Sequence, residues 1–239
     1  MIPKHIHYCW FGRGEKPKLV QKCIASWKAH LPDYTFTEWN EDNFDVEKND
    51  FVRGAYAHRN FAFVSDYARA EALYNEGGIY LDTDVEVLRT FDPFLRHTFF
   101  AGFESGNFVG TCVMGAEKGY ALLRDYTAHY DAVRFEQEDG SLYKDTNVVL
   151  LTRLLEERGF ARDGTLQEKD GVAVYPRTFF SPYDYIDAVS YITDESVAIH
   201  HFAQFWLPRR VRLKTLLKRQ LVRLVGGERL RRLLGRSRV

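Results

Sequence analysis

Two aspartates, Asp82 and Asp84, are the residues of this sequence whose type and spacing point most directly to chemistry. They follow a short apolar stretch, residues 79–81, which comes after a pair of glycines. Alternation along a strand predicts that both carboxylates project to one side. Neighbouring carboxylates repel unless a cation neutralises them, and a hard divalent ion bound by carboxylates and substrate phosphates suits Mg²⁺ or Mn²⁺. The spacing predicts a metal–diphosphate site, although a bare Asp-x-Asp also occurs at solvated strand ends.

The segment before this acidic stretch predicts a helix over residues 61–76. Asn60 is suited to cap the start of this helix, and Gly77 to stop it. Asp66 and Arg69 are three residues apart and share a helix face, so they fit a surface ion pair worth roughly a few tenths of a kcal/mol. Alternatively, the helix places the carboxylate of Asp66 and the guanidinium of Arg69 in the same cleft as the two aspartates. The planar fork of an arginine can hold hydroxyls or phosphate oxygens at two points, which suits a nucleotide-sugar.

Three separated motifs carry a resemblance to a known family. The first is IPKHIHYCWFG at residues 2–12, the second combines FVSDYAR at 63–69 with GGIYLDTD at 77–84, and the third is IHHFAQFW at 199–206. In this order they resemble the DXD-containing sugar transferases of glycosyltransferase family 32, which are related to the clostridial glucosylating toxins. The resemblance spans about residues 2–207, and three ordered motifs make it more specific than the aspartate pair alone.

The resemblance implies a single GT-A type α/β domain and a metal-dependent glycosyltransferase that retains anomeric configuration. Its expected reaction moves a sugar from a UDP- or GDP-sugar to a saccharide or lipid-linked acceptor. Its expected role is surface polysaccharide synthesis, such as that of a capsule. Retention is expected to proceed by attack of the acceptor hydroxyl from the same face, so no strong general base is required.

The resemblance also implies roles for individual residues. It makes Asp82, Asp84 and Arg69 the catalytic residues. The expected nucleotide-sugar-binding residues are Trp10, Asp66, Arg69, Tyr80, Asp82 and Trp206. Trp10 would stack on the nucleotide base, and Trp206 would donate its indole N–H to the β-phosphate.

A histidine is expected to complete the metal shell. His200 and His201 lie in the last predicted strand, residues 197–202, and adjacent strand residues face opposite ways, so only one can enter the site directly. We choose His201, which matches the pattern of related retaining transferases, and predict Asp84, His201 and Asp82 as metal ligands, with Asp82 contacting the ribose or a metal-bound water. Carboxylate plus imidazole suits Mn²⁺. Family members more often have Gly-Ser where this chain has Gln204 and Phe205, so a hydroxyl contact to phosphate is missing or replaced.

The order of elements predicts an open, mostly parallel, Rossmann-like sheet flanked by helices. A strand at 4–10, a helix at 16–30 and a strand at 34–39 form a parallel unit, and the helix at 61–76 feeds a strand at 78–82. Such sheets bind ligands beyond the carboxyl ends of their strands, where Trp10 and Asp82 are expected. Later elements are predicted as a strand at 99–104, helices at 119–133 and 146–158, and a strand at 172–180 broken by Pro176.

Composition separates a catalytic body, residues 1–207, from an appendage, residues 208–239. The chain has 239 residues, and 45% of them are hydrophobic, which is enough for a substantial core. Its three cysteines, Cys9, Cys23 and Cys112, have neither disulfide-scaffold nor zinc-ligand spacing, which favours a reducing compartment. No signal peptide and no apolar stretch of about 20 residues is recognisable, so a cytoplasmic location is expected.

The appendage is strongly basic. Residues 208–239 carry 12 Lys or Arg and one acid, Glu228, a net charge of +11, whereas residues 1–207 carry 21 basic and 32 acidic residues, a net charge of −11. Leucines at near-helical intervals predict two short amphipathic helices, one before and one after the glycine pair at residues 226–227. We expect them to hold the protein on the anionic inner face of the membrane. Docking on the acidic body and a solvated tail are alternatives; nucleic-acid binding is not expected, because the tail has no aromatic residue for base stacking.

Two other functions fit part of the pattern. A haloacid-dehalogenase-type phosphohydrolase also ends an apolar strand in Asp-x-Asp and would use Asp82 as nucleophile. That motif normally opens its domain, and the later acidic motif of such enzymes is not found here. A non-catalytic sugar- or membrane-binding protein on a transferase scaffold is the other alternative.

Overall fold

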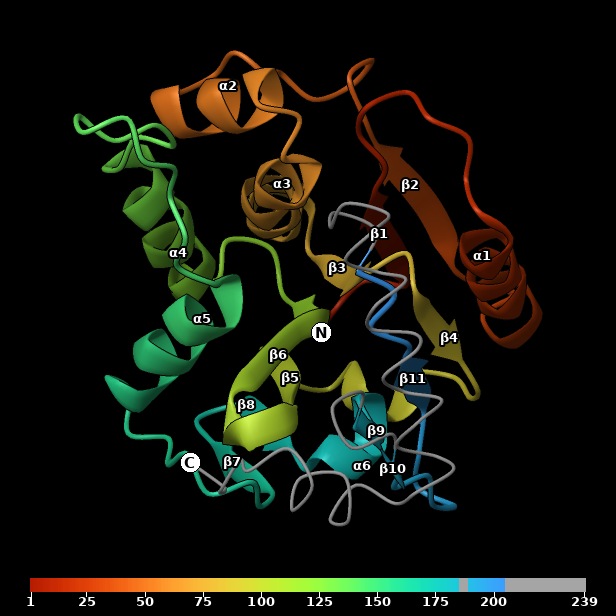
Figure 1. Ribbon diagram of the computed structural model, residues 1–239. Coiled ribbons are helices and arrows are strands. Elements are labelled where there is room, and N and C mark those ends of the chain that lie inside the picture. The colour runs from red at the N-terminus through yellow and green to blue at the C-terminus, as the bar shows by residue number, and fades with distance from the viewer. Residues whose placement is uncertain (185–188, 205–239) are drawn as a thin grey trace, which may run out of the picture.

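A computed structural model describes residues 1–184 and 189–204 of the protein (Figure 1). The first half contains β1 (His5–Cys9), α1 (Lys18–His30), β2 (Thr35–Trp39), α2 (Asp50–Ala57), α3 (Phe61–Glu76), β3 (Gly78–Leu81), β4 (Val85–Val87), η1 (Asp92–Phe94), β5 (Phe99–Phe103), η2 (Ser105–Asn107) and β6 (Val109–Ala116). The second half contains α4 (Ala121–Asp131), α5 (Asn147–Glu156), β7 (Gln167–Lys169), β8 (Val172–Tyr175), α6 (Arg177–Phe180), β9 (Tyr183–Asp184), β10 (Val189–Ser190) and β11 (Ala198–His200).

A seven-stranded sheet forms the centre of the molecule, in the order β2-β1-β3-β6-β5-β8-β7. Strands β1, β2 and β3 are parallel to one another, as are β5 and β8, whereas β6 is antiparallel to both β3 and β5, and β7 is antiparallel to β8. Five strands therefore run one way and two the other. The predicted mostly parallel α/β sheet is what the structure contains.

The sheet is the middle of three layers (Figure 1). Helices α2, α3, α4 and α5 pack on one face, around a core that includes Phe51, Leu73, Tyr80 and Met114. Helices α1 and α6 and the two-stranded sheet β11-β4 cover the other face, around Trp27, Ile79 and Phe100. Burial on both faces explains why β3 is a continuous apolar run without alternation.

The glycine pair between α3 and β3 is required by the backbone. Gly77 has φ 70° and Gly78 has φ 114°, both in the left-handed region. A Cβ at Gly78 would lie 2.5 Å from the carbonyl oxygen of His5 in β1. The chain can therefore leave α3 and enter the centre of the sheet within two residues, which sets the position of the aspartates that follow.

Several sequence predictions differ from the structure in detail. Residues 177–180 form helix α6 rather than the end of a strand, because Pro176 ends β8 and then begins a helix. Asn60 is the N-cap of α3, but its side chain makes no capping hydrogen bond. Helix α2 and the central strand β6 were not predicted. The tail, residues 208–239, lies outside the described residues, and so does the proposed domain boundary after residue 207.

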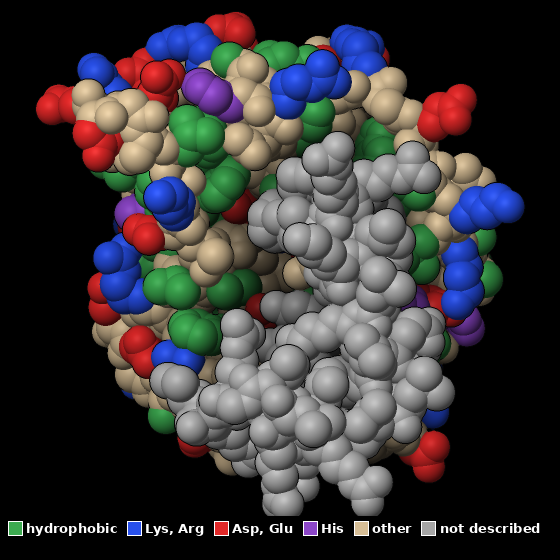
Figure 2. Space-filling view, in the orientation of Figure 1, with side chains coloured by type: hydrophobic (Ala, Val, Ile, Leu, Met, Phe, Trp, Pro, Cys, Tyr) green, Lys and Arg blue, Asp and Glu red, His purple; other side chains and the backbone are tan. Residues whose placement is uncertain are grey.

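No helix within residues 1–184 and 189–204 has the length and apolar character needed to cross a membrane. On the face shown in Figure 2, basic and acidic side chains are interspersed over the described surface along α2, α4 and α5. Neither sign dominates that part of the surface.

A buried histidine, His7 of β1, makes two hydrogen bonds that fix the tautomer of its neutral ring. Its Nε2 lies 2.8 Å from the carbonyl oxygen of Gly77, and Trp39 donates its indole N–H to Nδ1 over 3.1 Å. Nε2 is therefore the protonated nitrogen and Nδ1 the acceptor. Burial, together with the neighbouring His5, lowers the pKa of His7 to about 4 despite the bond to Gly77.

Acid is expected to destabilise the protein through His7. The unfolded chain binds a proton below about pH 6.5, whereas folded His7 stays neutral until about pH 4. Stability is thus present above the unfolded pKa and falls with pH by roughly 1.4 kcal/mol per pH unit in this window. Between about pH 7 and pH 5, the free energy of unfolding, measured in urea, should decrease by about 2 kcal/mol more for the native protein than for His7→Gln. The exposed His30 gives a control, His30→Gln; equal pH dependence in all three proteins would contradict the prediction.

Candidate active site

The two aspartates lie on the turn between β3 and β4, not on one extended strand. Strand β3 ends at Leu81, and a hydrogen bond of 2.9 Å from the amide of Val85 to the carbonyl oxygen of Asp82 closes the turn. The prediction of strand alternation was wrong here, because β4 leaves the central sheet and pairs with β11. The turn still brings the carboxylates together: Asp82, Asp84 and His200 have ligand atoms within 4.8 Å of one another.

Arg69 is the buried centre of the site. Only 4% of its surface is exposed. Its Nη2 lies 3.0 Å from Oδ1 of Asp66, and its Nη1 lies 3.3 Å from Oδ1 of Asp82. Nη1 also donates to the carbonyl oxygen and the hydroxyl of Thr111, both at 3.0 Å, and the guanidinium lies 4.6 Å from the ring centroid of Tyr80. Asp66 and Arg69 are thus a buried ion pair joined to the first aspartate, not a surface pair.

Asp66 is almost fully enclosed, with 6% of its surface exposed. Burial raises its pKa to about 6, although Arg69 and a hydrogen bond from Asn147 act in the opposite direction. That bond runs from Nδ2 of Asn147 to Oδ1 over 2.5 Å. Asp82 is more open, with 25% of its side chain exposed, and accepts a hydrogen bond of 3.1 Å from the hydroxyl of Tyr80.

Asp84 has its own set of partners. Its Oδ1 lies 3.5 Å from Nε2 of His200, and its Oδ2 accepts a hydrogen bond of 2.7 Å from the amide of Ala203. Burial alone would raise the pKa of Asp84, but His200 and the Ala203 amide outweigh it and the pKa is lowered. Burial would likewise lower the pKa of His200, but Cys112 and Asp84 outweigh it and the pKa lies well above its ordinary value.

His201 does not join the aspartates. Its Nε2 lies 2.9 Å from Oε2 of Glu86, which also accepts from Lys22 over 2.8 Å. The structure therefore places His200, and not the predicted His201, beside Asp82 and Asp84. The reason is register: β11 pairs with β4 so that Ile199 lies opposite Glu86, and His201, two residues further, shares that face. Metal binding by His201 stays a prediction.

The two tryptophans have different outcomes. Trp10 directly follows β1, and Asp82 directly follows the parallel strand β3, so both lie at the carboxyl ends of the strands. The indole N–H of Trp10 donates to the carbonyl oxygen of Gly14 over 2.7 Å. The ammonium of Lys16 lies 5.8 Å from its ring. Trp206 lies outside the described residues. Gln204 occupies the position at which family members more often have glycine, and its φ of 52° is a left-handed conformation that favours glycine.

Two side chains of the site were missed in the sequence. Asn147 is the first residue of α5 and holds Asp66, and Thr111 of β6 holds Arg69. The sequence predicts a helix at residue 147 but no strand at residue 111, and it carries no signal of either role, because both side chains reach the site only when α5 and β6 pack beside α3.

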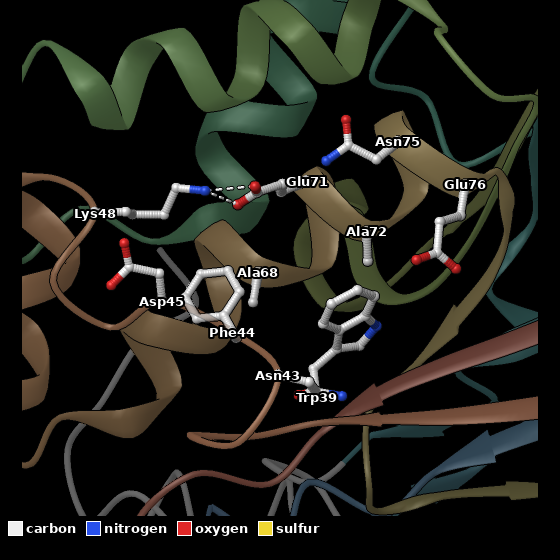
Figure 3. Close-up of a pocket in the computed structure, with 10 residues that line it drawn as sticks. All are labelled: Trp39, Asn43, Phe44, Asp45, Lys48, Ala68, Glu71, Ala72, Asn75 and Glu76. Carbon is white, nitrogen blue, oxygen red and sulfur yellow. Dashed lines mark hydrogen bonds and ion pairs between the residues drawn. The ribbon is translucent and has the colours of Figure 1, made fainter.

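A separate hollow of about 150 Å³ lies on the other side of α3 (Figure 3). It is lined by Trp39, Asn43, Phe44, Asp45, Lys48, Ala68, Glu71, Ala72, Asn75 and Glu76. Residues 66 and 69 project from one side of α3, and residues 68, 71, 72 and 75 from the opposite side. The hollow therefore contains none of the predicted site residues.

A known family model matches the part of the chain that contains the two aspartates. Residues 17–101 match the family model described as "Glycosyltransferase sugar-binding region containing DXD motif". Residues 17–101 thus resemble the sugar-binding region of DXD glycosyltransferases. This region includes Asp66, Arg69, Asp82 and Asp84.

A curated relative, "Inositol phosphoceramide mannosyltransferase 3" of Schizosaccharomyces pombe (strain 972 / ATCC 24843), is 29% identical over 129 residues. The match covers 51% of this chain and 35% of the relative, so the chain spans about a third of that protein's length. Both sequence matches confirm the predicted resemblance to DXD-containing sugar transferases and support the prediction of a glycosyltransferase.

Solved structures show the fold. The structure titled "PaToxG Glycosyltransferase" matches with a TM-score of 0.50 and 16% identity, over 66% of this chain and 70% of that one. A glycosyltransferase "involved in the glycosylation of the major capsid of PBCV-1" matches with a TM-score of 0.45 and 12% identity, over 89% of this chain and 98% of that one. The predicted GT-A type α/β fold is confirmed by the first of these likenesses.

Replacement of Arg69 is expected to destabilise the protein strongly. Arg69→Met leaves Asp66 without its cation inside the protein, and breaking a buried pair costs about 3–5 kcal/mol. The exposed pair of Arg96 and Glu168 provides a matched control, since Arg96→Met should change the free energy of unfolding by no more than about 1 kcal/mol. Urea unfolding measures both, and equal losses in the two variants would contradict a structural role for the buried guanidinium.

Proposed function

We propose that the protein transfers a sugar from a UDP- or GDP-sugar to a saccharide or lipid-linked acceptor, with retention of anomeric configuration. One observation carries this proposal: a buried ion pair, Asp66–Arg69, is joined at 3.3 Å to the first aspartate of a DXD turn. A buried guanidinium beside two carboxylates suits a ligand with a diphosphate at one end and sugar hydroxyls at the other. The name of the yeast relative makes mannose the first sugar to test.

The side chains of the turn fit a divalent metal. Asp82, Asp84 and His200 offer two carboxylates and an imidazole within 4.8 Å, a donor set suited to Mn²⁺ and, with more water ligands, Mg²⁺. His201 is the alternative imidazole that the family resemblance implies. Bound there, the ion would stabilise the negative charge of the departing diphosphate.

The chain's own residues would place the donor. Arg69, fixed by Thr111 and Asp82, keeps its charge and orients Asp66 toward the sugar. Asn147 fixes the same carboxylate from the other side. Trp10, at the edge of the sheet, would stack on the nucleotide base, and Trp206 would donate to the β-phosphate. Because the acceptor would attack from the face of the departing group, no residue is assigned as a strong base.

Nucleotide release is expected to depend on the second aspartate. Purified protein with Mn²⁺ and separate UDP- and GDP-sugars should release nucleotide diphosphate, and Asp84→Asn should lower that rate on the order of a hundredfold or more, because stabilisation of the leaving charge is lost. Asp139, in an exposed loop, gives the matched control Asp139→Asn, whose rate should not change. His200→Ala and His201→Ala in the same assay identify the imidazole that binds the metal.

Other outcomes of this assay support other functions. Cleavage of a phosphomonoester without nucleotide release, abolished by Asp82→Asn, would indicate a phosphohydrolase. Binding of a nucleotide-sugar with neither reaction would indicate a non-catalytic binder. Release that is unchanged in Asp84→Asn would exclude the proposed site.

We further propose that residues 208–239 hold the protein on the anionic inner face of the membrane, where it would serve surface polysaccharide synthesis. The net charge of +11 and the leucine spacing support this. Each basic residue near such a surface contributes about 1 kcal/mol. The full chain should sediment with anionic vesicles and remain in solution with neutral ones, and a chain that ends at residue 207 should remain in solution with both. Equal sedimentation of the two chains would exclude the tail as the membrane contact.

A further inference from the structure

Three groups of metal-ligating side chains occur within the described residues, each with ligand atoms less than 4.8 Å apart. The first is the aspartate pair with His200. The second combines His5, His7 and Glu76, but both ring nitrogens of His7 already make hydrogen bonds, to Gly77 and Trp39. The third combines Glu104, Cys112 and His200, and the proposed reaction makes no use of its cysteine and glutamate.

The third group differs from the aspartate pair in its chemistry. It offers a sulfur, an imidazole nitrogen and a carboxylate, a set that favours Zn²⁺ and other thiophilic ions over Mg²⁺ or Mn²⁺. Glu104 directly follows β5, Cys112 belongs to β6 and His200 ends β11, so two strands and the residue after a third supply the ligands. Cys112 is 3% exposed, whereas Glu104 is partly exposed.

Two further observations indicate that this group is prepared for a ligand. His200 turns Nε2 toward Asp84, so its buried Nδ1 is the nitrogen that interacts with the Cys112 thiol, without a hydrogen bond of normal geometry. A buried nitrogen with so weak a partner costs free energy, which a ligand can recover. The carboxylate of Glu104 occupies space that a side chain at residue 110 would need, because a Cβ on Gly110 would lie 2.9 Å from Oε2 of Glu104.

We propose that Glu104, Cys112 and His200 form a second metal site, selective for thiophilic divalent ions such as Zn²⁺. The ion binds the thiolate of Cys112, Nδ1 of His200 and a carboxylate oxygen of Glu104, and water completes a tetrahedral shell. Binding releases to solvent the proton of the thiol and any proton on Nδ1.

The second site is coupled to the aspartate pair through the shared imidazole. An ion on Nδ1 fixes the ring of His200 and places positive charge beside Asp82 and Asp84. The aspartate pair then binds its own ion more weakly, so Zn²⁺ inhibits sugar transfer. This consequence rests on the proposed function, whereas the binding of a thiophilic ion does not.

Cobalt is the probe for binding, because a Co²⁺–thiolate bond gives a charge-transfer band in the near ultraviolet. The full-length protein should show this band with Co²⁺, and Asp84→Asn should retain it, since Asp84 belongs to the other site. Cys112→Ser and Cys112→Ala should lose the band, the second variant avoiding a buried hydroxyl, and Cys23→Ser should keep it as a buried-cysteine control. A band that survives in both Cys112 variants, or no band in the native protein, would overturn the proposal.

Inhibition is measured in the same proteins as Zn²⁺-dependent loss of nucleotide release at saturating Mn²⁺. Half-inhibition of the Cys112 variants should need about tenfold more Zn²⁺ or higher, the range found when a metal site loses one contact. Equal sensitivity of native protein and variants would refute the coupling. A cobalt band in a protein that releases no nucleotide would support the second site and refute the proposed function.

Discussion

The buried guanidinium of Arg69 is the interaction on which the rest of the site depends. It is 4% exposed and lies between two carboxylates, Asp66 and Asp82, at 3.0 and 3.3 Å. A charge taken out of water is tolerated only when it is paired and its donors are satisfied. Thr111 and the backbone of Ser65 accept further hydrogen bonds from the guanidinium. Helix α3, strand β6 and the turn after β3 are therefore held in one fixed relation by one side chain.

This arrangement explains how much could be read from the sequence. Helix α3 was predicted at its observed residues, 61–76, because a glycine stop and a run without proline or interior glycine act locally. Strands β1, β2 and β3 were predicted within a residue or two, because the patterns that indicate a strand are local as well. The burial of Asp66 and Arg69 could not be predicted, since an i,i+3 pair reads the same on a solvated face and on a buried one. Only the packing of α4 and α5 on α3 decides between these cases.

The choice between two adjacent histidines shows the same limit. Alternation requires that His200 and His201 face opposite ways, and the sequence contains no signal for which way the first one faces. The register of β11 on β4 decides it, because Ile199 lies opposite Glu86 and His201 therefore meets Glu86. A shift of one residue would exchange the two rings. This register places Val197 and Ala198 in the core that also contains Trp27 and Val85, which is a property of the assembled fold.

The electrostatics of the aspartate pair differ from the simplest expectation. Two neighbouring carboxylates were expected to repel until a metal neutralises them, yet each has its own partner: Arg69 and the Tyr80 hydroxyl for Asp82, His200 and the Ala203 amide for Asp84. The pair is thus stable before any ion binds. A guanidinium keeps its charge at all accessible pH values, so Arg69 holds Asp82 in place throughout, whereas the imidazole beside Asp84 can change its charge with pH.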